Sequence, residues 1–350
     1  MLFELPYQRL LILTEGSLSM FSAKTGVPVL RYRGRDCVGV LDSHCAGRPI
    51  AELVDGVPDV PIYATVAEAM EQRPDAILIG IAPSGGRLPD MMRRHLTDGL
   101  RNGLSIISGL HTMLREDEEL VGLAEQHGAR LHDVRDSGRI MHIARGQARY
   151  TRAKRVLTVG TDCNSGKMVT ALELSKEAVR QGLDARFVAT GQTGIMIEGW
   201  GIAIDHVISD FTPGAAELLV QHVADSDMCI IEGQGSIGHP AYSAVMLGLL
   251  HGACPDAMVL VHRPGRVLHN DWPDCPLAPI RQQIALYESA LAVLHPGKVV
   301  AVALNTARMA AEDAESAVRE IAAETGLPVA DPIRHGCGKL LAAVRAHVGI

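Results

Sequence analysis

The stretch that decides the fold is Arg155-Val156-Leu157-Thr158-Val159-Gly160-Thr161-Asp162-Cys163-Asn164-Ser165-Gly166-Lys167-Met168-Val169-Thr170. Its apolar start predicts a short buried strand, and the residues after Lys167 begin a helical pattern. A loop that ends in Gly-Lys joins the two. This order of strand, loop and helix is typical of a phosphate-binding P-loop, in which backbone N–H groups, the helix N-terminus and the lysine converge on an anion.

Two features separate this loop from the common P-loop. Gly160 stands one residue further from Gly166 than the common pattern allows, a spacing that resembles the loop of dethiobiotin synthetase. Met168 occupies the position of the serine or threonine that usually holds magnesium, and Thr170 points elsewhere on the helix. We therefore expect a phosphate or diphosphate site without magnesium-dependent cleavage of a nucleotide. The expected cofactor-binding residues are Gly160, Thr161, Asp162, Cys163, Asn164, Ser165, Gly166, Lys167 and Met168.

The composition is that of an ordinary globular protein. Its 350 residues suggest about two domains, and the 47% of them that are hydrophobic provide ample core. A net charge of −7 and an aromatic content of 3% argue against a nucleic-acid partner. We recognise neither a signal peptide nor an apolar run long enough to span a bilayer, so we expect a cytoplasmic protein without a membrane partner.

The cysteines give no sign of a metal or disulfide framework. All seven are scattered, and none forms a Cys-x-x-Cys pair. This usage predicts reduced thiols and argues against a structural zinc site. We therefore expect no metal.

The first part of the chain alternates apolar strands with helical patterns. We expect strands over 9–16, 37–42, 75–82 and 104–109, and helices over 65–72, 90–102 and 116–126. This alternation predicts a parallel, doubly wound, Rossmann-like sheet. No Gly-x-Gly-x-x-Gly follows the first strand, so a nicotinamide cofactor is not supported. Loops 43–48 and 83–87 follow strands and are either ligand positions or ordinary turns.

The pattern becomes basic and less regular around 136–150, which places a domain boundary there. The strands and helices alternate again after it. We therefore predict an α/β protein, with a Rossmann-like domain over 1–148 and a P-loop domain with a parallel sheet over 149–350.

A second motif follows the buried strand 228–231 and reads Glu232-Gly233-Gln234-Gly235-Ser236. An acidic residue at a strand tip beside a P-loop is a Walker-B arrangement, and glycines let a ligand approach closely. Glu232 is a candidate general base, metal ligand or amine-binding group, or else a structural carboxylate that accepts loop N–H bonds. His239 is the other candidate catalytic residue because histidine titrates near neutrality, although a structural role is equally compatible with the sequence.

Polar residues after two further strands complete the expected site. Residues 190–194 form a glycine-bracketed turn after one strand, and His262, Arg263, Arg266, His269 and Asp271 cluster after another. A cationic cluster suits a di-acid or a phosphate, and the alternative is a solvated loop. The expected substrate-binding residues are Gln192, Thr193, Gln234, Ser236, Arg263 and Arg266.

Together, the long P-loop, the 190–194 turn and the 232–236 motif resemble a two-domain P-loop family that includes D-glutamate N-acetyltransferases. The resemblance covers nearly the whole chain. It implies transfer of an acetyl group from acetyl-CoA to the amine of D-glutamate, in a route of D-amino-acid catabolism. We also expect a homo-oligomer.

Acyl transfer is compatible with the residues themselves. Coenzyme A carries phosphates that a P-loop can hold without magnesium, and aminolysis of a thioester needs a base for the amine and donors for the oxyanion. Glu232 or His239 can be that base, and Cys163 is either an acyl-carrying nucleophile or a small filler of the loop. Two other functions remain open: an ATP-dependent ligase of the dethiobiotin synthetase type, and a non-catalytic nucleotide- or CoA-binding module.

Overall fold

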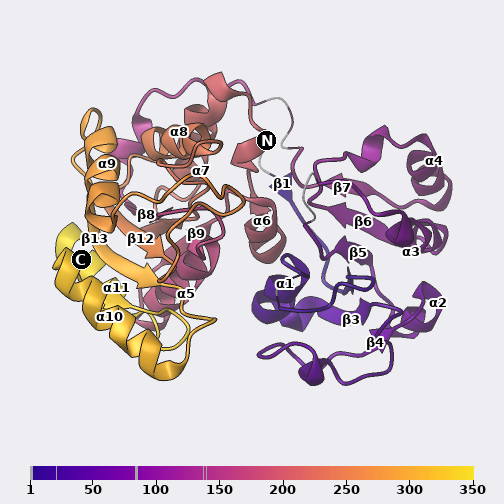
Figure 1. Ribbon diagram of the computed structural model, residues 1–350. Helices are drawn as coiled ribbons and strands as arrows, with labels where there is room; N and C mark the ends of the chain where they lie inside the picture. Colours follow the sequence, from indigo (N-terminus) through magenta and orange to yellow (C-terminus); the bar gives the residue numbers. More distant parts are fainter. Residues whose placement is uncertain (1–2, 21, 83–85, 137, 139) are drawn as a thin grey trace. The chain divides into compact units, whose positions relative to one another are not determined.

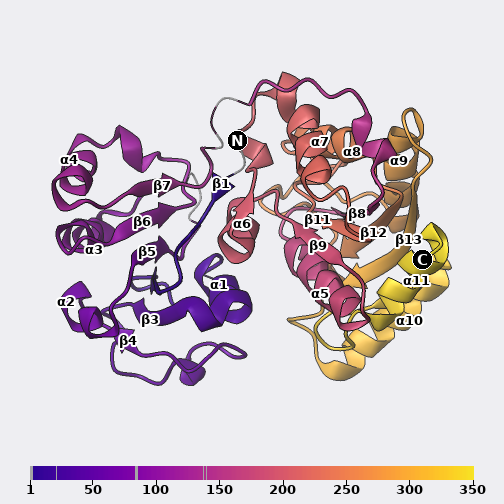
Figure 2. The ribbon, with the colours of Figure 1, turned by 180° about the vertical axis from the view of Figure 1, so that it is seen from behind.

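The computed structural model describes residues 3–20, 22–82, 86–136, 138 and 140–350. The chain forms two compact units (Figures 1 and 2). The first unit comprises Met1–Gly138 and Ile195–Ala203, and the second comprises Arg139–Gly194 and Ile204–Ile350. Each contains a parallel sheet with helices on both faces, so the prediction of an α/β fold is confirmed.

The sheet of the first unit has the strand order of a Rossmann-like fold. Its six strands within the described residues run β4-β3-β2-β5-β6-β7 and are all parallel. They are β2 (Leu10–Leu13), β3 (Cys37–Leu41), β4 (Ile62–Tyr63), β5 (Ala76–Ile79), β6 (Ser105–Ser108) and β7 (Leu131–Asp133). Counted along the unit, this order is 3-2-1-4-5-6, which places a topological switch point between β2 and β5.

Helices cover both faces of this sheet. They are α1 (Gly26–Arg33), α2 (Val66–Ala69), α3 (Asp90–Arg101) and α4 (Glu118–His127). In Figure 1, α1 lies on one face, while α2, α3 and α4 lie on the other. The apolar positions of α3, among them Met92, Leu96 and Leu100, are fully buried against Ile77 and Ile106 of the central strands. Periodic apolar residues on strand and helix thus produce the core that the sequence predicts.

A short strand from later in the chain belongs to the first unit. β10 (Trp200–Gly201) pairs in antiparallel fashion with β1 (Phe3–Glu4), and the N–H of Leu5 donates to the carbonyl of Gly199 at 2.8 Å. Strands of two residues are too short to show a periodic pattern, so this pairing is not predictable from the sequence.

The sheet of the second unit is centred on the P-loop strand. Its six strands within the described residues run β14-β13-β12-β8-β11-β9, again all parallel. They are β8 (Lys154–Gly160), β9 (Ala185–Val188), β11 (Met228–Ile231), β12 (Ala257–His262), β13 (Lys298–Leu304) and β14 (Val329–Ala330). Because parallel strands end at the same edge, the loops after β8, β11, β12 and β13 are neighbours.

Helices also cover both faces of the second sheet. They are α5 (Lys167–Arg180), α7 (Thr212–His222), α8 (Ser243–Ala253), α9 (Ile280–Ala292), α10 (Ala311–Thr325) and α11 (Gly338–Val348). Helices α5 and α11 pack on one face, and α7, α8 and α9 on the other (Figure 2). The remaining helix, α6 (Gln192–Glu198), runs from the second unit into the segment that belongs to the first. No helix among the described residues is long and apolar enough to cross a membrane.

The basic stretch before the P-loop strand is anchored on α7. Glu217 of this helix is fully buried and accepts hydrogen bonds from the N–H groups of Arg145 and Gln147 and from His142 Nε2. Burial raises the pKa of the Glu217 carboxyl, but these donors outweigh burial, so the pKa lies below its usual value. Gly214 permits the contact, because a Cβ there would overlap the carbonyl of His142. The residues that the sequence marked as a boundary thus pack on the second unit.

Candidate active site at the P-loop

The loop between β8 and α5 has the conformation of an anion-binding nest. Asn164 (φ 52°) and Gly166 (φ 111°) adopt left-handed backbone angles, which turn successive N–H groups toward one side. Thr158 Oγ1 bonds the carbonyls of Lys167 and Ile231 at 3.2 and 3.3 Å and accepts from the Gly233 N–H at 3.1 Å. The tip of β11 is therefore fixed directly beside the loop.

Lys167 lies buried at the base of the loop. Its Nζ donates to the carbonyl of Asp162 at 2.9 Å and to Ser165 Oγ at 3.4 Å. Burial lowers the pKa of Lys167, while the acidic groups Cys163, Asp162 and Glu232 act in the opposite direction. A buried ammonium group held inside a nest of N–H groups is a site for phosphate oxygens.

Asp162 joins the P-loop to the segment after β12. Its buried carboxylate accepts hydrogen bonds from Arg266 Nη1 (2.7 Å), His269 Nδ1 (3.0 Å) and the N–H of Asn270 (2.8 Å). Burial raises the pKa of Asp162, but these donors lower it by more. Arg266 Nη1 also donates to the carbonyl of Cys163 at 2.8 Å. Arg266, which we expected to bind substrate, is thus engaged in holding the loop.

His239 is held in one tautomer. The N–H of Ala241 donates to His239 Nδ1 at 3.1 Å, which assigns the proton of the neutral ring to Nε2. Burial, and then the neighbouring His269, lower the pKa of His239, so the ring is neutral near pH 7. Its buried Nε2 has no hydrogen-bond partner among the described residues and lies 3.7 Å from Asp162 Oδ1. An Nε2 that carries the proton offers no lone pair, which argues against His239 as the base.

The same tautomer of His239 also argues against a metal ion at this site. Asp162, His239 and His269 each offer a ligand atom within 4.8 Å of the others, and two imidazoles with one carboxylate suit a divalent transition metal. Metal binding through His239 Nε2 requires the proton on Nδ1, where the Ala241 N–H points. The donor set in this arrangement therefore does not fit a metal, and we derive no step through one.

Glu232 follows the last residue of β11 and is 4% exposed. Its Oε2 accepts hydrogen bonds from the N–H groups of Thr190 (3.0 Å) and Gly191 (3.1 Å). Burial raises the pKa of Glu232 to about 7, although these N–H bonds act in the opposite direction. A Cβ at Gly194 would overlap Glu232 Oε2, so the glycine provides the space for the carboxyl group. A carboxyl group with this pKa can take up a proton at neutral pH.

The 190–194 segment is not the simple turn that the sequence suggested. Gln192 begins α6, so Gln192 and Thr193 lie in the first turn of a helix, because the apolar residues after Gly194 continue a helical pattern. Gln234 Nε2 donates to Thr190 Oγ1 at 3.2 Å, which connects the 232–236 motif to the start of this segment.

Helix α9 contributes two buried residues that the sequence analysis missed. Tyr287 Oη donates to the carbonyl of Gly160 at 2.7 Å and accepts from the N–H of Ile237 at 3.0 Å. It also lies 3.5 Å from Ser236 Oγ. Gln283, one turn earlier, donates from Nε2 to the carbonyl of Thr161 at 3.2 Å. Their spacing of four residues on one helix face was the available signal.

His262 ends β12, and Arg263 begins the loop after it. Thr161 Oγ1 and His262 Nδ1 are hydrogen-bonded at 3.0 Å, and burial, followed by Arg266, lowers the pKa of His262 to about 4. Arg263 is half-buried and forms no hydrogen bond or ion pair with any described residue. Of the expected cationic cluster, Arg263 is thus the guanidinium that keeps its donors available.

Cys163 lies within the loop, and Met168 follows the loop as the second residue of α5. Burial raises the pKa of the Cys163 thiol to about 11, which opposes formation of the thiolate that an acyl-carrying nucleophile needs. Met168 lies in the first turn of α5, where its thioether offers no hydroxyl to a magnesium ion.

In the first unit, the loop over 43–48 is hydrogen-bonded to Glu15, which follows β2. Ser43 donates from its N–H (3.0 Å) and from Oγ (2.6 Å) to Glu15, and His95 Nε2 lies 3.0 Å from the same carboxylate. These partners lower the pKa of Glu15 although burial raises it. The contacts correspond to the structural alternative for this loop. Residues 83–85 of the other expected loop lie outside the described residues.

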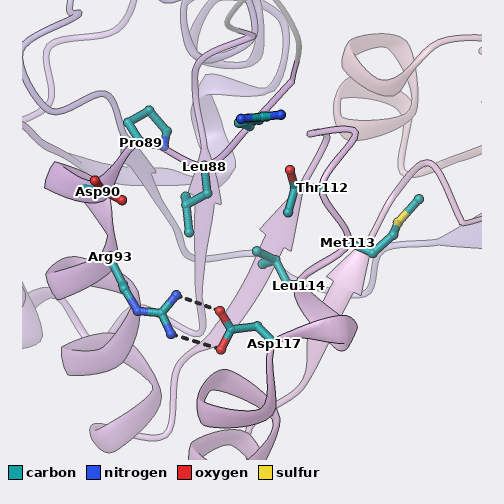
Figure 3. Close-up of a pocket in the computed structure, with 9 residues that line it drawn as sticks. Leu88, Pro89, Asp90, Arg93, Thr112, Met113, Leu114 and Asp117 are labelled. Atoms are coloured by element: carbon teal, nitrogen blue, oxygen red, sulfur yellow. Dashed lines mark hydrogen bonds and ion pairs between the residues drawn. The ribbon is translucent and has the colours of Figure 1, made fainter.

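A separate cavity of ≈ 360 Å³ belongs to the first unit. Figure 3 shows Arg93 and Asp117 bonded to each other in the lining of this cavity, with two hydrogen bonds of 2.6 and 2.9 Å. Glu119 also pairs with Arg93, so the charge of the arginine is neutralised. The cavity is lined by Arg87, Leu88, Pro89, Asp90, Arg93, Thr112, Met113, Leu114 and Asp117. None of these is an expected catalytic or binding residue.

A Rossmann-like unit and a P-loop unit in one chain define a class of two-domain P-loop proteins, and comparison with known proteins places the chain within it. Residues 43–137 match the DUF1611 N-terminal Rossmann-like domain, and residues 142–341 match the DUF1611 C-terminal P-loop domain, both described as domains of unknown function. The chain belongs to the DUF1611 family.

Two relatives carry a name that describes an activity. A D-glutamate N-acetyltransferase of Tritonibacter scottomollicae is 36% identical over 349 residues, which cover 99% of this chain and 100% of the relative. A protein of the same name from a Pseudoalteromonas species is 38% identical over 284 residues, 79% of this chain and 83% of the relative. The expectation of a family that contains acyltransferases is confirmed by these relatives.

A solved structure shares the whole architecture. The crystal structure of a DUF1611 family protein from Anabaena variabilis superposes with a TM-score of 0.92 at 40% identity, and covers 97% of this chain and 99% of that one.

Proposed function

We propose that this protein is an N-acetyltransferase that moves the acetyl group of acetyl-CoA to the amine of D-glutamate. The observation that carries the proposal is the pairing, on adjacent strands, of a phosphate nest lacking the magnesium hydroxyl with a buried carboxyl group of pKa about 7. The names of two relatives at 36% and 38% identity support the acceptor and the type of reaction.

In the proposed reaction, the diphosphate of the donor occupies the N–H nest with Lys167. Glu232 takes a proton from the ammonium group of the acceptor, and the neutral amine attacks the thioester carbonyl. The C–N bond forms and the C–S bond breaks. The electron pair of that bond leaves with the sulfur of coenzyme A, which takes up the proton that the attacking nitrogen loses, so free thiol is released. Loop N–H groups stabilise the oxygen that becomes negative on the way.

The acceptor lies, in this proposal, on the β11 and β9 side of the P-loop. The N–H groups of Thr190 and Gly191 bond Glu232, and Gln234 bonds Thr190. In the proposal, Gln192 and Thr193, which follow in the first turn of α6, and Gln234 and Ser236 offer neutral donors and acceptors for the polar groups of the acceptor. We assign the reaction to D-amino-acid catabolism. A homo-oligomer and a cytoplasmic location stay predictions.

The decisive experiment measures release of free coenzyme A thiol from acetyl-CoA with a panel of D- and L-amino acids. We expect the highest kcat/KM with D-glutamate and a product mass increased by one acetyl group. Turnover that requires ATP and magnesium would instead identify a ligase. Binding of acetyl-CoA in a thermal-shift screen without turnover on any amino acid would identify a non-catalytic module.

A further inference from the structure

Three arginines follow two neighbouring strands on one side of the P-loop. Arg263 and Arg266 come after β12, and Arg308 comes after β13. The two loops start together, since His262 pairs with Leu304 and the N–H of Asn305 donates to the His262 carbonyl at 2.9 Å.

These loops are continuous with the phosphate nest. Asn305 Nδ2 donates to the carbonyl of Ser165 at 3.0 Å, and Arg266 donates to the carbonyl of Cys163. An anion bound in the nest therefore has this cationic segment as its neighbour.

One guanidinium group of this segment has no acidic partner among the described residues. The carboxylate of Asp162 takes the charge of Arg266, whereas Arg263 pairs with no acidic group among the described residues. Burial, and then Arg266 and Arg308, lower the pKa of Arg263, which shows that like charges face it. Arg263 is half-buried and Arg308 is exposed, and guanidinium groups that lie near one another are stabilised by an anion that bridges them.

The distance between Glu232 and the end of β13 decides which anion can reach Arg308. The order β13-β12-β8-β11 places the tip of β13 three strands from Glu232, about 14 Å at the usual strand spacing. A free amino acid of the size of glutamate is shorter than two extended residues, about 7 Å. A glutamate whose amine is at Glu232 therefore ends well before Arg308, whereas a second phosphate on a long acyl donor can reach it.

We infer that Arg263 and Arg308 form an anion subsite, separate from the P-loop nest, that takes the phosphate monoester on the ribose of an acyl-CoA donor. The inference rests on the proposed function, since it assumes that the donor is a CoA thioester. It assigns Arg263 to the donor rather than to the carboxylates of the acceptor.

The test compares coenzyme A with dephospho-coenzyme A, which lacks only this phosphate, by isothermal titration of the full-length protein. We expect the unmodified protein to bind coenzyme A about 10- to 100-fold more tightly, the effect of one or two charge-assisted hydrogen bonds. Arg263→Ala and Arg308→Ala should each reduce this ratio at least several-fold, while the Kd for dephospho-coenzyme A stays unchanged. Arg263→Lys should restore part of the ratio, and Arg319→Ala, an exposed arginine on α10, should not alter it.

Each other outcome overturns the inference in a distinct way. An unchanged ratio in Arg263→Ala, with a raised KM for D-glutamate, would assign the arginine to the acceptor. An equal loss of affinity for both nucleotides would assign it to the nest. If neither nucleotide binds the unmodified protein, the proposed function itself fails.

Discussion

Burial sets the proton equilibria of the two ionisable side chains closest to the proposed reaction. Lys167 and Glu232 both lie within the protein, and burial lowers the pKa of the lysine and raises that of the glutamate to about 7. An anionic ligand in the nest opposes the lowering of the Lys167 pKa, and the glutamate is available as a base near neutral pH.

Glu232 gives the first prediction. Only the deprotonated carboxylate accepts a proton, so kcat/KM should fall as the pH decreases through about 7 and should level off above it. Glu232→Gln keeps the shape, and should lower kcat by about 10²–10⁴-fold and abolish this acidic limb. Thiol release measured across pH checks both, with exposed Glu312→Gln as control. Normal turnover in Glu232→Gln would assign the base elsewhere.

Lys167 gives the second prediction. Lys167→Ala removes a charged partner from a buried phosphate, a loss of about 1.5–3 kcal/mol, or roughly 10- to 150-fold in Kd. Calorimetric titration with acetyl-CoA should show this weakening, whereas Lys176→Ala on the exposed side of the same helix should bind normally. An unchanged Kd for Lys167→Ala would contradict phosphate binding in the nest.

Met168 gives the third prediction. Because its side chain offers magnesium no hydroxyl, thiol release should be the same with added magnesium and with EDTA. A large loss of activity in EDTA that magnesium restores would show that another group holds the ion.

Whole elements were predictable where local periodicity decides them. The P-loop strand, α5 and the strand before Glu232 have uninterrupted apolar or helical patterns, and the structure has them. Contacts between distant elements were not predictable, because no local pattern reports them. Tyr287 contacts Gly160, which is 127 residues away in the sequence, and Arg266 contacts Asp162, which is 104 residues away. Because the contact with Asp162 leaves no local pattern, the sequence suggested a substrate-binding role for Arg266.

The role of α9 leads to the fourth prediction. Tyr287→Phe removes the donor to the Gly160 carbonyl and the acceptor for the Ile237 N–H, and should cost about 1–3 kcal/mol of unfolding free energy because both groups are buried. It should also weaken acetyl-CoA binding, since the loop loses a support. Chemical denaturation and titration measure the two effects. The same substitution at Tyr150, which is 74% exposed, should change neither.

At the scale of the whole molecule, the two sheets could be predicted from the alternation of strands and helices alone. That residues 195–203 belong to the first unit could not be predicted. Long-range pairing through strands of two residues leaves no trace in composition or spacing. The P-loop, Glu232 and the arginine subsite, by contrast, all belong to the second unit.

This division gives the fifth prediction. Scanning calorimetry of the full chain should resolve two unfolding transitions, because each unit has its own core. Coenzyme A at about 100 times its Kd should stabilise one of them by roughly 2.7 kcal/mol and leave the other in place. A single transition that shifts as a whole would show that the units unfold together.

The pairing of β1 with β10 also constrains how the protein is made. On a translating ribosome, the partner of Phe3–Glu4 is synthesised only after the P-loop strand β8 and the next strand of the second sheet, β9. Strand β1 therefore stays without its partner strand while nearly two hundred further residues are synthesised. A nascent chain arrested before residue 200 should therefore be cut by protease near its N-terminus, and one arrested well beyond it should resist.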